Sequence, residues 1–204
     1  MFNNNDTVLI KCFNMAANLH KKVNQSYDDL PYSFHLKLTA SYAEKYMNLV
    51  LNEIENKDRQ RKICYVLNLA AYFHDLIEDA RVTYNDLVKL LKNECLPRNI
   101  NYLHSMIADI VYACTNEKGK NRDERANDKY YEGIRTTSYA PFIKLCDRLA
   151  NVRYSTLFDV NSKMAKVYKK EHEHFINQLT CLQSNPYISI MEEEMKVLLK
   201  DTEL

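Results

Sequence analysis

The chain has 204 residues and a formal net charge of +1, and 46% of its residues are hydrophobic and 27% charged. This balance is ordinary for a globular protein and lacks the strong basic charge that favours binding to nucleic acid or to an anionic membrane. No apolar run is long enough for a membrane helix and no signal-peptide pattern opens the chain, so we expect a cytoplasmic protein.

Helical periodicity begins near the N-terminus. Asn5 or Asp6 is a suitable N-cap for a first helix. The apolar stripe of that helix consists of Leu9, Phe13, Ala16 and Leu19. A second helix is expected over residues 33–55. Residues 63–73 are apolar nearly all round, which predicts a helix at the centre of the core.

The second half of the chain continues in the same way. Thr83 and Asp86 resemble a capping box and predict that a helix begins between them. Further helices are expected over residues 100–114, 122–136, 140–157, 160–182 and 187–200. The sequence has only two glycines and four prolines, few of the breakers that strand-rich folds need, and its six scattered cysteines are interpreted as reduced core residues. We therefore predict one all-α domain over residues 1–204.

Four ionisable side chains are expected at the end of the same apolar helix as residues 63–73: His74, Asp75, Glu78 and Asp79. Such groups are costly to bury without partners, so we expect a bound cation beside them. Because residues four apart share a face of a helix, His74 is expected to stack with Glu78, and Asp75 with Asp79.

Other segments offer further ligands. Asp147 and Asn151 are four residues apart in an apolar setting, and His35 follows Pro31-Tyr32. Two imidazoles and two carboxylates together favour Mn²⁺, Fe²⁺ or Zn²⁺ over Mg²⁺. Taken singly, His74 also suits a core histidine, and His35 suits a structural or solvent-exposed histidine. Asp147 with its neighbouring arginine also suits a surface ion pair.

Three motifs together resemble the HD-domain metal-dependent phosphohydrolases. The finer resemblance is to the hydrolase domain of the RelA/SpoT alarmone enzymes and to the stand-alone small alarmone hydrolases. The motifs are Pro31-Tyr32-Ser33-Phe34-His35, His74-Asp75-Leu76-Ile77-Glu78-Asp79 and Lys144-Leu145-Cys146-Asp147-Arg148-Leu149-Ala150-Asn151-Val152-Arg153. They cover about residues 15–157. The resemblance implies an HD-type helical bundle with a central metal site, on which C-terminal helices over residues 158–204 pack.

The resemblance also implies the chemistry. One Mn²⁺ would be held by His35, His74, Asp75 and Asp147. Glu78 and Asp79 would orient or deprotonate the attacking water and return a proton to the leaving oxygen. The reaction of the family is removal of the 3′-diphosphate from the alarmones ppGpp and pppGpp, which gives pyrophosphate and GDP or GTP. No synthetase domain fits in the remaining residues.

Substrate recognition is expected to involve Asn151 and Tyr154. The family usually carries a basic pair eight to twelve residues before the first metal histidine, and this chain has no cation there. The nearest basic residues are Lys21 and Lys22, and Tyr27 is a candidate to stack on a base instead.

A charged loop offers a second source of positive charge. Lys118 and Arg122, with Lys120 and Arg125, are candidates to bind phosphates, or form a solvated loop. The segment Glu171-His172-Glu173-His174 is interpreted as a solvated helix face, because its histidines point apart on a helix. Two other functions stay open: an HD hydrolase acting on another nucleotide, such as a deoxynucleoside monophosphate or NADPH, and a non-catalytic alarmone sensor.

Overall fold

Helices form nearly all of the regular structure in the computed structural model, which describes residues 4–158, 163–180 and 185–203. The helices are α1 (Asn4–Lys22), α2 (Ser33–Leu51), α3 (Lys57–Phe73), α4 (Leu76–Asp79), α5 (Tyr84–Leu90), α6 (His104–Cys114), α7 (Arg122–Arg125), α8 (Asp128–Thr136), α9 (Ala140–Leu157), α10 (Lys163–Thr180) and α11 (Pro186–Leu199). A π-helical turn η1 (Leu91–Cys95), a 3₁₀ segment η2 (Arg98–Leu103) and two antiparallel strands, β1 (Ser26–Tyr27) and β2 (Leu30–Pro31), complete the order. The all-α prediction is confirmed, apart from this unexpected hairpin of two short strands.

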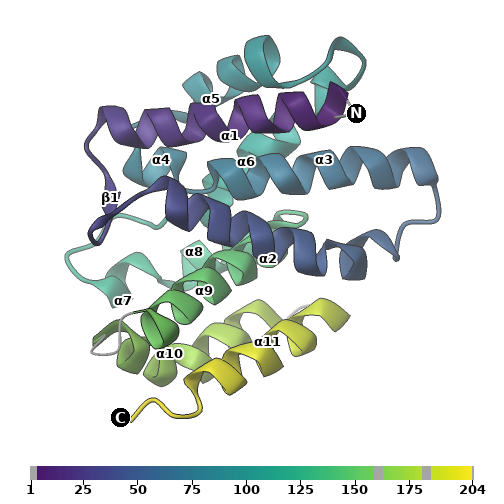
Figure 1. The fold of residues 1–204 in the computed structure, drawn as a ribbon. Coiled ribbons are helices and arrows are strands. Elements are labelled where there is room, and N and C mark those ends of the chain that lie inside the picture. The colour runs from purple at the N-terminus through teal and green to yellow at the C-terminus, as the bar shows by residue number, and fades with distance from the viewer. Residues whose placement is uncertain (1–3, 159–162, 181–184, 204) are drawn as a thin grey trace.

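The core lies where α2, α3 and α9 pack together in the middle of the bundle (Figure 1). Figure 1 shows α1 and α5 above this central group and α10 and α11 below it. Each central helix contributes side chains with no exposed surface: Leu36 from α2, Leu67 and Phe73 from α3, Phe142 and Leu149 from α9. Burial of such large apolar side chains stabilises the fold by about 1.5–3 kcal/mol each.

Helix boundaries differ from the prediction where local capping decides them. The structure begins α1 at Asn4, so the prediction of an N-cap at Asn5 or Asp6 is wrong. The helix predicted over residues 33–55 ends at Leu51. Thr83 does cap α5, and its hydroxyl accepts a hydrogen bond from the Asp86 amide at 3.2 Å.

The single helix predicted over residues 122–136 is divided into α7 and α8. Asn127 causes the division, because its side chain caps α8 by accepting a hydrogen bond from the Tyr130 amide at 3.0 Å. The helix predicted over residues 100–114 begins as the 3₁₀ segment η2. The predicted helix over residues 160–182 is seen as α10, and its expected ends lie outside the described residues.

The most consequential difference is at the end of α3. The helix stops at Phe73, and α4 begins at Leu76, so His74 and Asp75 lie in the turn between them. The amide of Asp79 still donates to the Asp75 carbonyl at 2.8 Å. The expectation that one continuous helix carries all four ionisable residues is therefore wrong, because the backbone breaks where the first two occur.

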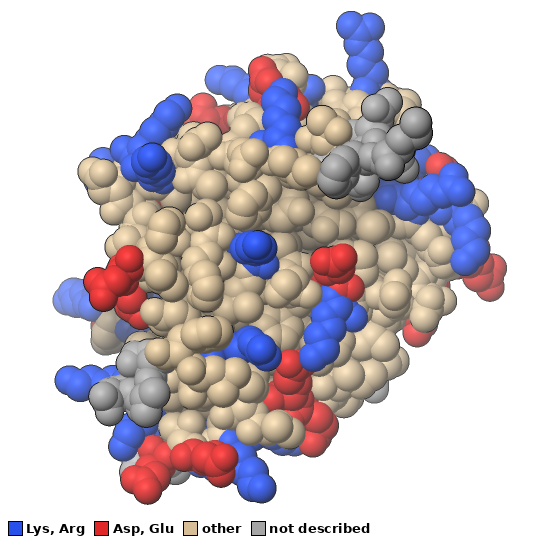
Figure 2. Space-filling view, in the orientation of Figure 1, with Lys and Arg blue, Asp and Glu red and all other residues tan. Residues whose placement is uncertain are grey.

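The surface carries both signs of charge. Figure 2 shows Lys and Arg side chains interspersed with Asp and Glu over the visible face. In the described part of the chain, no helix combines the length and the apolar character needed to cross a bilayer. The described cysteines are free thiols, and Cys181 lies outside the described residues.

Candidate metal centre

Four side chains that are far apart in the sequence converge between α2, α9 and the turn after α3. His35 lies in the first turn of α2, His74 and Asp75 lie in the turn, and Asp147 lies midway along α9. All four are buried, and one possible ligand atom from each lies within 4.8 Å of the others. We call these four residues the metal cluster. Among the described residues it is the one such group of His, Cys, Asp and Glu.

The distances within the metal cluster fit a shared cation. His35 Nε2 lies 3.1 Å from His74 Nε2. His35 Nε2 also lies 3.3 Å from both Asp75 Oδ2 and Asp147 Oδ1. Ligand atoms bound to one transition-metal ion at about 2.1 Å are about 3–3.5 Å apart. His74 Nε2 and Asp147 Oδ1 are farther apart, at 3.7 Å, and all four ligand atoms lie within 4.8 Å of one another, close enough for one ion to contact them all.

The orientation of His74 fits the same use. Its Nδ1 lies 2.9 Å from the backbone oxygen of Ala71, a contact in which Nδ1–H donates, so Nε2 is the nitrogen available to a cation. Nε2 then faces Asp75 Oδ2 at 2.8 Å and His35 Nε2 at 3.1 Å. Two imidazole nitrogens that face each other so closely need a proton or a cation between them.

The electrostatics of the cluster also favour a cation. Burial opposes the charge of Asp147, yet Lys144 and the two histidines hold its pKa well below the usual range. Burial lowers the pKa of His74, but Asp75 and Asp147 together raise it to about 10. The two carboxylates thus attract positive charge, which protons on the histidines supply when no cation does.

Two neighbours on α9 hold Asp147 in place. Lys144 Nζ donates to Oδ2 at 2.8 Å, and Asn151 Nδ2 donates to Oδ1 at 2.6 Å. The Lys144 side chain is only 12% exposed, so this ion pair is largely shielded from water. Asn151 was predicted to contact substrate, and the structure gives it this further contact with a residue of the metal cluster.

The two carboxylates after the turn lie in different surroundings. Burial and the nearby charge of Asp75 raise the pKa of half-buried Asp79 to about 6, although a hydrogen bond from Tyr32 opposes the shift. Glu78 is exposed, and the α6–α7 loop holds it: Asn116 donates to its carboxylate from the amide at 3.2 Å and from the side chain at 2.8 Å.

Tyr27, in β1, covers the metal cluster instead of standing free. Its ring stacks on His35, with centroids 4.8 Å apart, and its hydroxyl donates to Asn151 Oδ1 at 2.7 Å. The Tyr154 ring meets it edge-on at 4.6 Å and also contacts Phe34. Tyr27, which was predicted to stack on a base, and Tyr154, which was predicted to touch the ligand, therefore belong to a packed group beside the cluster.

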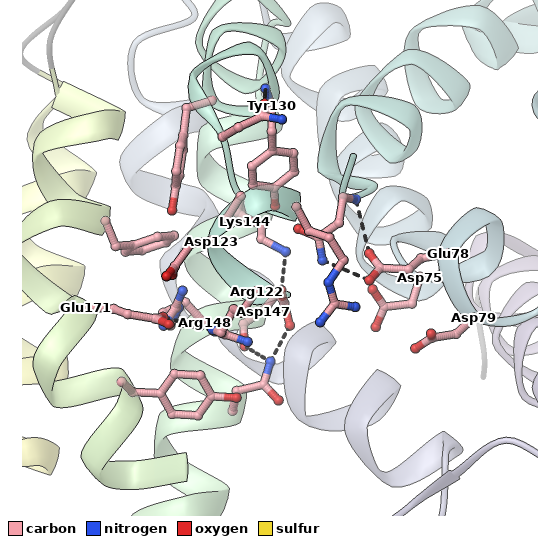
Figure 3. A pocket seen from close by; sticks show the side chains of 18 of the residues that line it. Asp75, Glu78, Asp79, Arg122, Asp123, Tyr130, Lys144, Asp147, Arg148 and Glu171 are labelled. Carbon is pink, nitrogen blue, oxygen red and sulfur yellow. Dashed lines mark hydrogen bonds and ion pairs between the residues drawn. The ribbon is translucent and has the colours of Figure 1, made fainter. Parts of the chain in front are cut away.

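A cavity of about 620 Å³ opens from the metal cluster. Asp75, Glu78 and Asp79 line one side of it (Figure 3). Figure 3 shows Glu171 and Arg148 on the opposite side, with Lys144 directed toward Asp147 between the two sides.

Two arginines form the opposite side of the cavity. Arg122 from α7 and Arg148 from α9 both bind the carboxylate of Glu171 on α10, each with one contact at 3.0 Å. The Arg148 guanidinium lies over the rings of Phe175 and Tyr168, at 4.3 Å and 4.8 Å from their centroids. We call these five residues the arginine wall. The two guanidinium groups share one carboxylate, and Asp123 and Asp128 also line the cavity.

The structure sorts the predicted substrate-binding residues. Tyr27, Asn151 and Arg122 line the cavity, as does Arg125. The residues that lie outside its lining are Lys21, Lys22, Lys118, Lys120 and Tyr154. The lysines in this group are exposed at a helix end or in a loop.

The interpretation of residues 171–174 as a solvated helix face is wrong for two of them. Glu171 is bound by two arginines, and the His172 side chain is only 12% exposed, with Nε2 3.8 Å from Glu192 on α11. Glu173 and His174 are exposed as expected, and His174 also borders the cavity and meets the Tyr131 ring edge-on at 5.8 Å. The pairing across helices α7, α9 and α10 draws this segment into the site.

Sequence reasoning missed several lining residues. Tyr130 and Tyr131 on α8, Tyr168 and Phe175 on α10, and Asn116 all border the cavity. Only spacing offered a signal: Tyr168, Glu171 and Phe175 recur at three and four residues, as on one face of a helix. Nothing in their local sequence distinguishes that face from an ordinary packing face.

Comparison with known proteins adds no further assignment. No protein-family model matches this chain, and no curated protein shows significant similarity to it.

Proposed function

We propose that this chain is a divalent-metal-dependent phosphohydrolase that removes the 3′-diphosphate from ppGpp and pppGpp. One observation carries the proposal: a buried cluster of two histidines and two aspartates opens, beside two further carboxylates, into a cavity whose opposite side carries Arg122 and Arg148. The three motifs and their resemblance to alarmone hydrolases supply the choice of substrate and of Mn²⁺.

The residues around the cluster suit phosphoester hydrolysis. A cation bound there would polarise a phosphoryl oxygen and lower the pKa of water. Asp79, with a pKa near 6, exchanges protons readily at neutral pH, which suits proton transfer to or from the reacting oxygens. Glu78 is held by Asn116 and reaches the same cavity, where it orients water.

The arginine wall suits the remaining phosphates of such a substrate. Guanidinium groups bind phosphate oxygens in a fork geometry, and Arg122 already holds the Glu171 carboxylate in that way, while Arg148 adds a single contact. A cavity of about 620 Å³ is within the usual size range of small-molecule sites. A nucleotide with phosphates at two positions can thus reach both sides.

A panel of nucleotides incubated with Mn²⁺ tests the proposal. We expect pyrophosphate and GDP from ppGpp, with products identified by ion-exchange chromatography, and no turnover after chelation. Inorganic phosphate from nucleoside monophosphates, with ppGpp untouched, would overturn the choice of substrate. Binding of ppGpp without products would instead indicate a sensor.

One observation favours the second candidate, an HD hydrolase of another nucleotide such as a deoxynucleoside monophosphate or NADPH. The segment before His35 brings no cation to the cavity, because Lys21 and Lys22 lie outside its lining. A preference for guanine therefore needs other contacts. Equal rates on ppGpp and on its adenine counterpart would favour this candidate.

A further inference from the structure

Tyr32 connects the metal cluster to one of the carboxylates beside it. Its hydroxyl lies 2.6 Å from Asp75 Oδ2 and 2.7 Å from Asp79 Oδ2. Asp75 Oδ2 is the same atom that faces both histidines of the cluster. One phenol oxygen thus contacts a ligand atom and the carboxylate to which proton transfer is assigned.

The ring that carries this hydroxyl has little freedom. Tyr32 is only 7% exposed and immediately precedes α2. His20, at the end of α1, stacks on one face of it with centroids 4.1 Å apart and ring planes 20° apart. Tyr27 and His35 contact the ring at steep angles, with centroids 6.2 Å and 5.5 Å away. Aromatic neighbours therefore fix where the hydroxyl points.

His20 acts on Tyr32 through its ring face. The imidazole has no exposed surface, and neither of its nitrogens has a hydrogen-bond partner in the described part of the chain. Burial lowers its pKa to about 4, so the ring is neutral at pH 7. A neutral ring without polar contacts serves here as a flat packing surface, which a phenyl ring can replace.

We propose that Tyr32, held by the His20 stack, is a positioning residue that fixes Asp79 relative to the metal cluster. The inference rests on the proposed function. Asp79 is half-buried, and in the described part of the chain no hydrogen bond other than that of Tyr32 ties its carboxylate to the cluster. A general acid or base must lie within about 2.6–3.2 Å of the atom it serves, and a displacement of about 1 Å costs roughly 100-fold in rate.

Replacement of the hydroxyl tests this link. In Tyr32→Phe, at saturating Mn²⁺, we expect kcat to fall about 10- to 100-fold with KM unchanged, and Mn²⁺ affinity to fall about 10-fold because Asp75 loses its hydrogen bond. Tyr84→Phe is the matched control: Tyr84 donates to Asp109 at 2.7 Å outside the cavity lining. It should change neither quantity, and an equal loss in both variants would contradict the proposal.

A double-mutant cycle shows whether Tyr32 acts through Asp79. In an Asp79→Asn background, Tyr32→Phe should lower kcat by less than about twofold, because the group it positions is gone. A further loss as large as that in the wild type would overturn the link. His20→Phe should keep kcat, while His20→Ala should lower it toward the Tyr32→Phe value; equal kcat in the two would remove His20 from the proposal.

Failure of the proposed function would look different. If the wild type hydrolyses no nucleotide, the function is wrong, but calorimetric titration with Mn²⁺ still reads the contact between Tyr32 and Asp75. Wild-type turnover with unchanged kcat and Mn²⁺ affinity in Tyr32→Phe would refute the positioning role alone. Circular dichroism melts show whether each variant folds. If Tyr32→Phe does not fold, His20→Ala tests the same link.

Discussion

The metal cluster and the arginine wall face the same cavity, yet different kinds of segment supply them. The cluster comes from α2, α9 and the turn after α3, in the middle of the bundle, and all of its side chains are buried. The wall depends on α7, a helix of four residues with an exposed arginine, and on α10. Under the proposed function, the cluster would hold the metal and the wall would contact the substrate.

The largest expected effect comes from breaking the cluster. Asp147→Asn removes a negative ligand, and we expect Mn²⁺ affinity to fall at least about 100-fold, with loss of turnover. Asp123→Asn is the control, because Asp123 lines the same cavity outside the cluster. Calorimetric titration measures the Mn²⁺ affinity of both variants. Wild-type affinity in Asp147→Asn would show that the cluster does not hold the metal.

A smaller effect separates the cluster from the carboxylate next to it. Glu78→Gln keeps the shape of the side chain and one of its two contacts with Asn116, but it removes the charge that attracts a water proton. We expect kcat to fall about 100- to 10,000-fold, while Mn²⁺ affinity stays within twofold. Steady-state kinetics with titrated metal decide this. Unchanged kcat would remove Glu78 from the mechanism.

The arginine wall should respond in substrate affinity. Arg148→Met removes one guanidinium, and we expect KM to rise about 10-fold or more, with kcat changed by less than about threefold. Lys118→Met is the control, because exposed Lys118 lies outside the cavity lining and should leave KM within twofold. If Lys118→Met raises KM as much as Arg148→Met, the loop and not the wall binds the substrate.

The smallest effect concerns the layer behind the cluster. The pKa of His20 falls from 6.5 to about 4 in the folded chain because of burial. Between pH 6.5 and about pH 4, the unfolded chain therefore binds a proton at His20 more readily than the folded chain does. Stability is lost as the pH falls through this range. Without metal, the free energy of unfolding of His20→Phe should fall by about 2 kcal/mol less than that of the wild type between pH 7 and pH 5, measured by urea unfolding. Parallel losses would contradict this.

Much of the fold followed from the sequence. The apolar run before His74 predicted a buried central helix, and α3 has that position with Leu67 and Phe73 fully buried. The same reasoning failed at the helix end, because periodicity cannot show that the backbone breaks after Phe73. Asn127 is likewise a cap that looks like an ordinary helix residue until its partner, the Tyr130 amide, is seen.

The cluster and the wall differ in how far the sequence could predict them. Each ligand of the cluster stands in a short motif, so its residue type and spacing could be recognised locally. The wall depends on a pairing between α7, α9 and α10, in which Arg122 meets Glu171 across 49 residues. Such a partner follows from how helices pack, which one sequence does not specify. Glu171 therefore looked like a solvated residue.

The separation of the ligands along the chain also has a consequence for folding. His35 and His74 are 39 residues apart and lie on different helices, and Asp147 arrives only with α9. Until these helices have docked, the chain offers no more than the adjacent pair His74 and Asp75. Metal should thus bind after the folding barrier is crossed, so that it slows unfolding and leaves the refolding rate nearly unchanged.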